Sequence, residues 1–154
     1  MTPTRLRLLL VVALVAAVVG WAVTTLVDAY AGRSLPVPWT APVVMALLAL
    51  ALVLWARGTR ARLARRPGTR PLEPIVAART AALAMAGSRV GAAVAGFYLG
   101  VALALSGSWS VAYVRELVLL SLATALASVG VVAASLWLER ILRLPPDATD
   151  EPTP

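Results

Sequence analysis

The sequence predicts an all-α fold, a bundle of four transmembrane helices arranged as two hairpins with a long central third helix. The first observation is composition, because 60% of the 154 residues are hydrophobic and only 14% are charged. A soluble domain of this length needs a larger polar fraction to cover its surface. The second is the presence of separate apolar runs, and the third is that arginines gather beside alternate runs.

The first apolar run, residues 8–27, is long enough to cross a membrane by itself. A helix of about 20 residues spans the ~30 Å hydrocarbon core, and no charge interrupts this run. A cleaved signal peptide is the alternative, because Ala29-Tyr30-Ala31 fits a cleavage pattern. The apolar core of a signal peptide is usually only about 7–15 residues long. We therefore expect residues 8–27 to be a permanent anchor.

The second run, residues 39–56, is expected to contain a helix from Pro42 to about Ala56. Such a helix would cover only ~22 Å, which is short for a membrane span. Trp39 and the apolar residues around it would then complete the crossing. Pro67, Gly68 and Pro71 follow and interrupt any helix.

The third helix is expected to begin near Pro74 and to cross the membrane over residues 86–105. It would be ~48 Å long, so its first third would lie outside the hydrocarbon. Two small-xxx-small pairs lie along it: Gly87 with Gly91, and Gly96 with Gly100. At 100° per residue the two pairs face opposite sides, so each pair can admit a different neighbouring helix at close range.

The fourth run, residues 117–138, carries small residues along one stripe, as a close-packed seam requires: Ser121, Ala125, Ser128 and Ser135. Pro145-Pro146 prevents the helix from continuing. We therefore expect one transmembrane domain, residues 1–146, and a disordered acidic tail, residues 147–154. Residues 16–21 resemble residues 92–97, which indicates either a duplicated hairpin or chance similarity of Ala/Val-rich spans.

The distribution of arginines predicts the orientation. With both termini in the cytoplasm, eleven arginines lie on the inner side and only Arg33 and Arg115 on the outer side, with Arg89 inside the third span. The positive-inside rule therefore places both termini in the cytoplasm, in the plasma membrane of the cell.

The arginines following the second run are candidate contacts for anionic lipid headgroups or an acidic partner: Arg57, Arg60, Arg62, Arg65, Arg66 and Arg70. The alternative is that they only fix the topology. Arg89 either extends its side chain to the inner headgroups or takes part in an ion pair within the bundle. We expect Glu139, at the inner end of the fourth helix, to lie near Arg79 or Arg89.

Catalysis finds little support in the residue types present. The chain has no His and no Cys, and it shows no metal-ligand cluster and no phosphate-binding loop. We therefore expect no catalytic residue, no metal, no cofactor and no enzymatic activity. The net charge of +7 is expected to face anionic lipid rather than nucleic acid. Small proton-coupled exporters require a carboxylate in their first span, and residues 8–27 contain none.

Several short motifs carry a family resemblance: Glu73-Pro74, Ala78-Arg79, residues 90–92, residues 95–100, residues 137–140 and Pro145-Pro146. Over nearly its whole length the chain resembles an actinobacterial family of small integral membrane proteins of unknown function. The resemblance implies four spans and a cell-membrane location. Family members often have Lys where this chain has Met85, and the resemblance supplies no catalytic residues.

The function expected from the sequence is that of a non-enzymatic accessory or interaction protein, which uses the arginine-rich loop and one glycine face of the third helix. Its partner is another membrane protein or a second copy of the chain. The alternative is a small-molecule or lipid transporter acting as an oligomer. A third possibility is a subunit of a membrane enzyme whose chemistry resides in its partner. A water-accessible cavity that reaches the middle of the membrane and is lined by Ser88, Arg89 or Tyr98 would favour transport. A solid centre of Ala, Gly and Ser would favour the accessory role.

Overall fold

The computed structural model describes residues 6–32, 36–63 and 74–142, and these residues contain four long α-helices, a short 3₁₀ turn and no strand. The helices are α1 (Leu6–Ala31), α2 (Thr40–Leu63), α3 (Pro74–Leu105) and α4 (Ala112–Leu142). The 3₁₀ turn, η1 (Ser106–Ser108), lies between α3 and α4. All four helices are long and apolar enough to cross a membrane, which fits a multi-pass membrane protein. The expected acidic tail lies outside the described residues.

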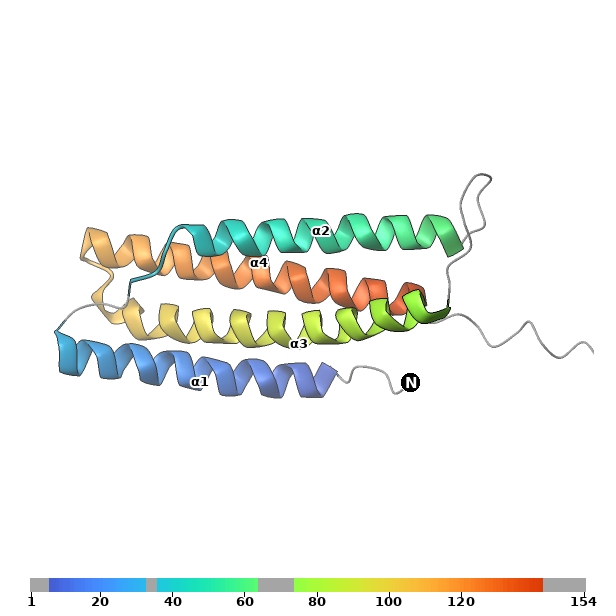
Figure 1. Ribbon diagram of the computed structural model, residues 1–154. Coiled ribbons are helices and arrows are strands. Elements are labelled where there is room, and N and C mark those ends of the chain that lie inside the picture. The colour runs from blue at the N-terminus through green and yellow to red at the C-terminus, as the bar shows by residue number, and fades with distance from the viewer. Residues whose placement is uncertain (1–5, 33–35, 64–73, 143–154) are drawn as a thin grey trace, which may run out of the picture.

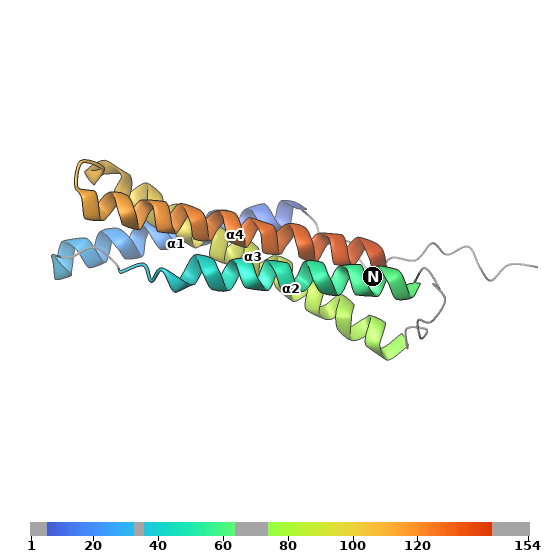
Figure 2. The same cartoon turned by 90° about the horizontal axis from the view of Figure 1, so that it is seen from above.

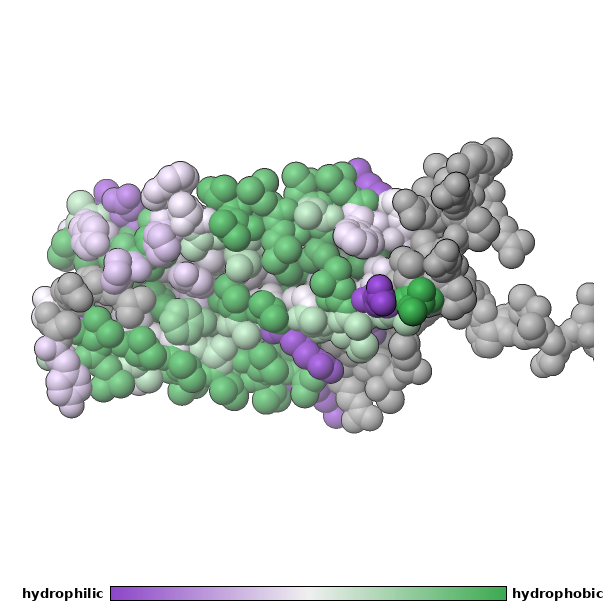
Figure 3. Space-filling view, in the orientation of Figure 1, coloured by the Kyte–Doolittle hydropathy of each residue, from purple (hydrophilic) through white to green (hydrophobic). Residues whose placement is uncertain are grey.

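The helices pack in the order α1–α3–α4–α2, as Figure 1 shows. α1 packs along α3 and α2 packs along α4, while α3 and α4 form the central pair. In the most apolar stretches, 44% of residues are buried in α3 and α4 but only 11% in α1 and α2. Seen from above, α3 crosses α4 obliquely (Figure 2). The face of the bundle drawn in Figure 3 is mostly hydrophobic across its middle.

The first pair of helices differs from the expected hairpin. In the described part of the chain α1 and α2 do not contact each other, because the α3–α4 hairpin lies between them. As a result α3 shares the central position with α4. Lipid solvates every apolar face of a membrane helix, so adjacency in sequence does not force two consecutive helices to pack together.

The second helix is longer than expected at both ends. It begins at Thr40, and it continues past Ala56 to Leu63. Its apolar part, Thr40–Arg60, has 21 residues and is ~32 Å long, enough to cross the hydrocarbon core. The expected end at Ala56 was wrong because arginine is a good helix former and the prolines begin only at Pro67.

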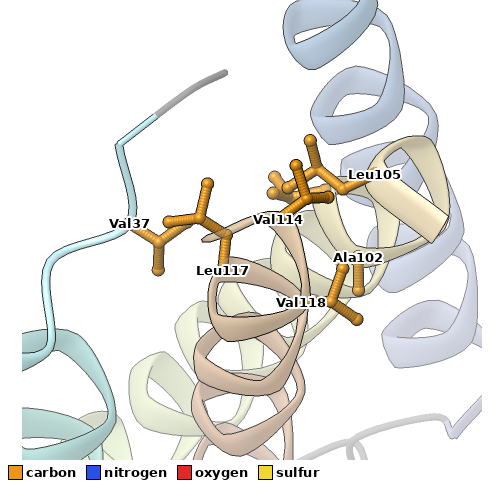
Figure 4. Close-up of a cluster of buried hydrophobic side chains, with 7 residues drawn as sticks. Val37, Ala102, Leu105, Val114, Leu117 and Val118 are labelled. Atoms are coloured by element: carbon orange, nitrogen blue, oxygen red, sulfur yellow. The ribbon is translucent and has the colours of Figure 1, made fainter. Parts of the chain in front are cut away.

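Specific contacts fix the end of α1 and the connection between α1 and α2. α1 ends where Gly32 adopts a positive φ of 59°, and its N–H donates to the carbonyl of Asp28 at 3.0 Å. A left-handed residue at this position is a common way to terminate a helix. Val37, in the connection that follows, packs against Val114 and Leu117 of α4 (Figure 4). The connection between α1 and α2 is thereby attached to the central pair.

Candidate functional site: helix seams and the arginine-bearing end

The contact between α1 and α3 brings two helix backbones together. A Cβ at Gly96 would fall on the carbonyl of Ala13 and lie 2.8 Å from its Cα. A Cβ at Gly100 would fall on the carbonyl of Ala17. The contact is reciprocal, because a Cβ on Gly20 of α1 would meet the carbonyl of Phe97 and lie 3.1 Å from its Cα. Only glycine allows helices to approach this closely.

The contact between α3 and α4 uses the opposite face of α3. A Cβ at Gly87 would lie 2.7 Å from the Oγ of Ser135, and one at Gly91 would lie 2.9 Å from the Cγ2 of Val132. The carbonyl oxygen of Ser128 is 3.1 Å from the same position at Gly91. The four glycines thus lie on two faces, with Gly87 and Gly91 against α4 and Gly96 and Gly100 against α1. The expectation that one glycine face serves a partner was wrong, because helices of the chain itself occupy both faces.

The face of α4 in this contact is a seam of small hydroxyl residues that are completely inaccessible: Ser121, Thr124, Ser128 and Ser135, with Ala125 only 3% exposed beside them. Three of the hydroxyls donate to a carbonyl one turn earlier in their own helix, each at 2.8 Å. Their polar atoms are therefore satisfied without any contribution from the facing helix.

Sequence reasoning missed two of the buried hydroxyls on these seams. Thr124 lies on the stripe between Ser121 and Ser128, and its helical spacing was available as a signal. Thr24 follows Gly20 by one turn on α1 and donates to the carbonyl of Gly20 at 2.8 Å. A search for Thr as well as Gly, Ala and Ser at i, i+3 and i+4 would have found both.

Ser135 is the exception in the seam. Its Oγ is buried and has no hydrogen-bond partner among the described residues. Burying a hydroxyl without a partner costs roughly 1–3 kcal/mol in proteins. We therefore expect Ser135→Ala to raise the free energy of unfolding by about 1 kcal/mol, measured by tryptophan fluorescence during unfolding in mixed micelles.

The matched control for this prediction is Ser121→Ala, which removes a hydroxyl that is bonded to the carbonyl of Leu117. We expect this variant to be unchanged or slightly less stable. If Ser135→Ala were clearly destabilising, the hydroxyl would have to bind a partner, and the assignment of Ser135 as unsatisfied would fail.

The predicted arginine cluster extends from a helix. Arg57 and Arg60 lie on the last turns of α2 and are exposed, and Arg62 also lies within α2. The other members, Arg65, Arg66 and Arg70, lie outside the described residues. The cluster therefore begins on a rigid helix end, which fixes the direction of its first arginines, and it is not confined to a loop.

The candidate ion pair involves one buried and two exposed residues. Glu139 of α4 is only 9% exposed, while Arg79 and Arg89 of α3 are exposed. Because Gly87 faces Ser135 in an antiparallel pair, Glu139 is level with Leu83, between the two arginines. Glu139 makes an interaction of its own, and its pairing with either arginine stays a prediction.

The depth of Arg89 follows from the contacts between α1 and α3, which run parallel. The Ala13–Gly96 contact places Arg89 level with Leu6, and the Gly20–Phe97 contact places it level with Val12. Arg89 therefore lies at the height of the first turns of α1, near Arg7. This position is near the same end of the bundle as Arg57 and Arg60.

The part of the chain that the structure describes offers no candidate metal site, and the comparisons gave no relative of known activity. The described residues contain no group of three or more His, Cys, Asp or Glu side chains that could hold a metal ion. Comparison with curated proteins and with solved structures gave no match. The profile of one family, described as a protein of unknown function (DUF3180), matches residues 9–146, which include α2, α3, α4 and all but the first three residues of α1. The chain therefore belongs to the DUF3180 family of proteins of unknown function.

Proposed function

We propose that this protein is an integral protein of the plasma membrane with both termini in the cytoplasm, and that it acts as a non-enzymatic accessory or interaction protein. Two surfaces are available for this role. One is the arginine-bearing end, where Arg57 and Arg60 are exposed. The other is the outer face of α1 and α2, each of which packs along one helix only.

The observation that carries the proposal is the closed seam between α3 and α4. Ser88, which a transport pathway would use, is completely inaccessible and donates to the carbonyl of Met85 at 3.0 Å. The facing hydroxyls of α4 are equally inaccessible, and Gly87 and Gly91 leave no room for a side chain between the helices. A centre packed in this way supports a scaffold rather than a pathway through the chain.

The outer helices are suited to binding a partner. Large side chains on α1 and α2 are exposed over most of the length of each helix, including Leu10, Leu14, Leu47 and Leu54, which are between 58% and 69% exposed. In a membrane these side chains contact either lipid or another transmembrane helix, and close helix packing decides between the two. The arginines provide a second, electrostatic contact with anionic lipid or an acidic partner.

Crosslinking with mass spectrometry in native membranes tests the accessory role. We expect the full chain to give reproducible crosslinks to one or a few other membrane proteins or to a second copy, through α1, α2 or the arginine cluster. A matched variant with Arg57 and Arg60 both changed to Gln should give fewer of the crosslinks that the arginine cluster makes and should keep those of the outer helices. If neither the outer helices nor the arginine cluster gave specific crosslinks, the result would contradict the accessory role.

The proposed orientation predicts a labelling pattern, which is simple to measure because the chain has no cysteine. Gly107 lies in the turn between α3 and α4, with nothing within 4 Å of the position of a Cβ, so Gly107→Cys should be tolerated. We expect an impermeant maleimide to label this variant in intact cells, because the turn faces outward. The opposite-side control, Thr69→Cys, should react only after the cells are opened. The reverse pattern would overturn the orientation.

A further inference from the structure

A shallow apolar groove of about 550 Å³ runs between α1 and α3 on the surface of the bundle. One wall is formed by α1 and the other by α3, and the lining residues are Val11, Val12, Val15, Ala16, Val19, Ala93, Val94, Phe97 and Tyr98. Small residues at Ala16 and Ala93 leave the space, and Phe97 packs edge-on against Tyr98 with ring centroids 5.6 Å apart. The groove therefore arises because small side chains lie on the facing surfaces of two helices, whose glycines allow the backbones to pack closely.

The length of the groove matches one leaflet of a bilayer. From Val11 to Val19 the wall formed by α1 is ~12 Å long at the rise of an α-helix. One leaflet contributes about 15 Å to the ~30 Å hydrocarbon core. A transmembrane helix from a partner or a second copy would need a groove that runs through the whole thickness of the hydrocarbon core. The length favours a single acyl chain.

A positive charge lies at one end of the groove. Arg89 is exposed, lies one helical turn before Ala93 and is level with residues 6–12 of α1, where the groove begins. Neither residues 6–27 of α1 nor residues 74–105 of α3 contain an Asp or Glu, and the one acidic residue of α1, Asp28, lies near the opposite end of that helix. The groove thus joins an apolar track to an arginine at headgroup depth, with no carboxylate beside that arginine on either of the two helices that form the groove.

We propose that this groove is a binding site for an anionic phospholipid, with one acyl chain along the valines of α1 and the phosphate on Arg89. A basic residue at the end of a cleft between transmembrane helices is the usual arrangement for recognising anionic headgroups. The lipid belongs to the leaflet on the side of the connection between α2 and α3. The inference rests on the membrane insertion proposed above and is independent of the accessory role.

Binding of defined lipids to the purified full-length protein tests the headgroup contact. Native mass spectrometry in detergent would compare phosphatidylglycerol with phosphatidylcholine of the same acyl chains. We expect tighter binding of phosphatidylglycerol to the unaltered protein, a loss of about fivefold in Arg89→Gln, and near-complete retention in Arg89→Lys. Arg140→Gln is the matched control, because it removes the same charge at the same end of the bundle from the last turn of α4, a helix that does not line the groove.

A second measurement locates the acyl chain. Phosphatidylglycerol with a photoreactive acyl chain, in nanodiscs that carry the full chain, should label residues 11–19 and 93–98, and Ala93→Phe should reduce this labelling. Equal binding of the two lipids, equal losses in Arg89→Gln and Arg140→Gln, or labelling spread over all helices would overturn the site. Crosslinks in the groove between two copies of the chain would also overturn it. Loss of partner crosslinks in native membranes would count against the accessory role alone.

Discussion

Replacing Gly96 by alanine should separate α1 from α3. The added methyl group would fall on the carbonyl of Ala13, a backbone atom that moves only if α1 moves. Overpacked contacts usually cost about 1–3 kcal/mol, and we expect a cost at the upper end because no flexible side chain can rotate away. The free energy of unfolding, measured by tryptophan fluorescence in mixed micelles, should fall by about 3 kcal/mol.

Gly58→Ala is the matched control for this experiment. It makes the same chemical change in a helical glycine, but nothing lies within 4 Å of the added methyl group. Helix propensity alone then favours alanine by up to about 1 kcal/mol, so this variant should be unchanged or slightly more stable. If both variants behaved alike, the close backbone contact between α1 and α3 would be wrong.

The position of α1 provides an independent readout of the same change. Ala16 of α1 and Ala93 of α3 line the same groove, and the chain has no other cysteine to interfere. A protein carrying Ala16→Cys and Ala93→Cys should be crosslinked by a short bismaleimide. Adding Gly96→Ala should reduce the yield, and an unchanged yield would show that α1 remains docked.

Replacing Ser128 by leucine should disrupt the central pair. Ser128 is completely inaccessible, and its backbone carbonyl lies 3.1 Å from the position of a Cβ at Gly91. A leucine side chain in this position must displace α3, at a cost of about 3 kcal/mol or more. Because α3 and α4 hold the two outer helices, we also expect loss of monodisperse protein in size-exclusion chromatography.

Ser128→Ala separates the steric effect from the hydrogen bond. The hydroxyl of Ser128 donates to the carbonyl of Thr124 within its own helix at 2.8 Å, and alanine removes this bond without adding volume. We expect a change of no more than about 1 kcal/mol in the free energy of unfolding. A large loss in Ser128→Ala would indicate that the hydroxyl bonds across the seam, contrary to the packing described above.

The two opposite faces of α3 that carry the glycine pairs could be predicted, because their directions follow from helix geometry alone. Once residues 74–105 are taken as one helix, the angle between Gly87 and Gly96 is fixed, and so are the two directions in which α3 can be approached closely. The helix itself was readable from Pro74 and the apolar run that ends at Leu105. Neither step required knowledge of the neighbouring helices.

The order of the helices could not be predicted in the same way. In water an apolar stripe reveals which face of a helix is buried, but in lipid an apolar face such as that of Leu10 and Leu14 is compatible with any neighbour. The sequence therefore left open which helix would occupy each glycine face. The groove beside Arg89 was hidden for the same reason, because it depends on the register between α1 and α3.

The separation of α1 from α2 has a consequence for biogenesis. The ribosome delivers these two helices first, yet neither has a tertiary neighbour until the chain that follows emerges. Both must wait in the bilayer as isolated segments, and the later hairpin must then enter between them. Assembly is therefore completed only when α3 and α4 have been synthesised and have packed between α1 and α2. A nascent chain that stops after Leu63 should hold two helices that are linked by their connection but do not pack against each other.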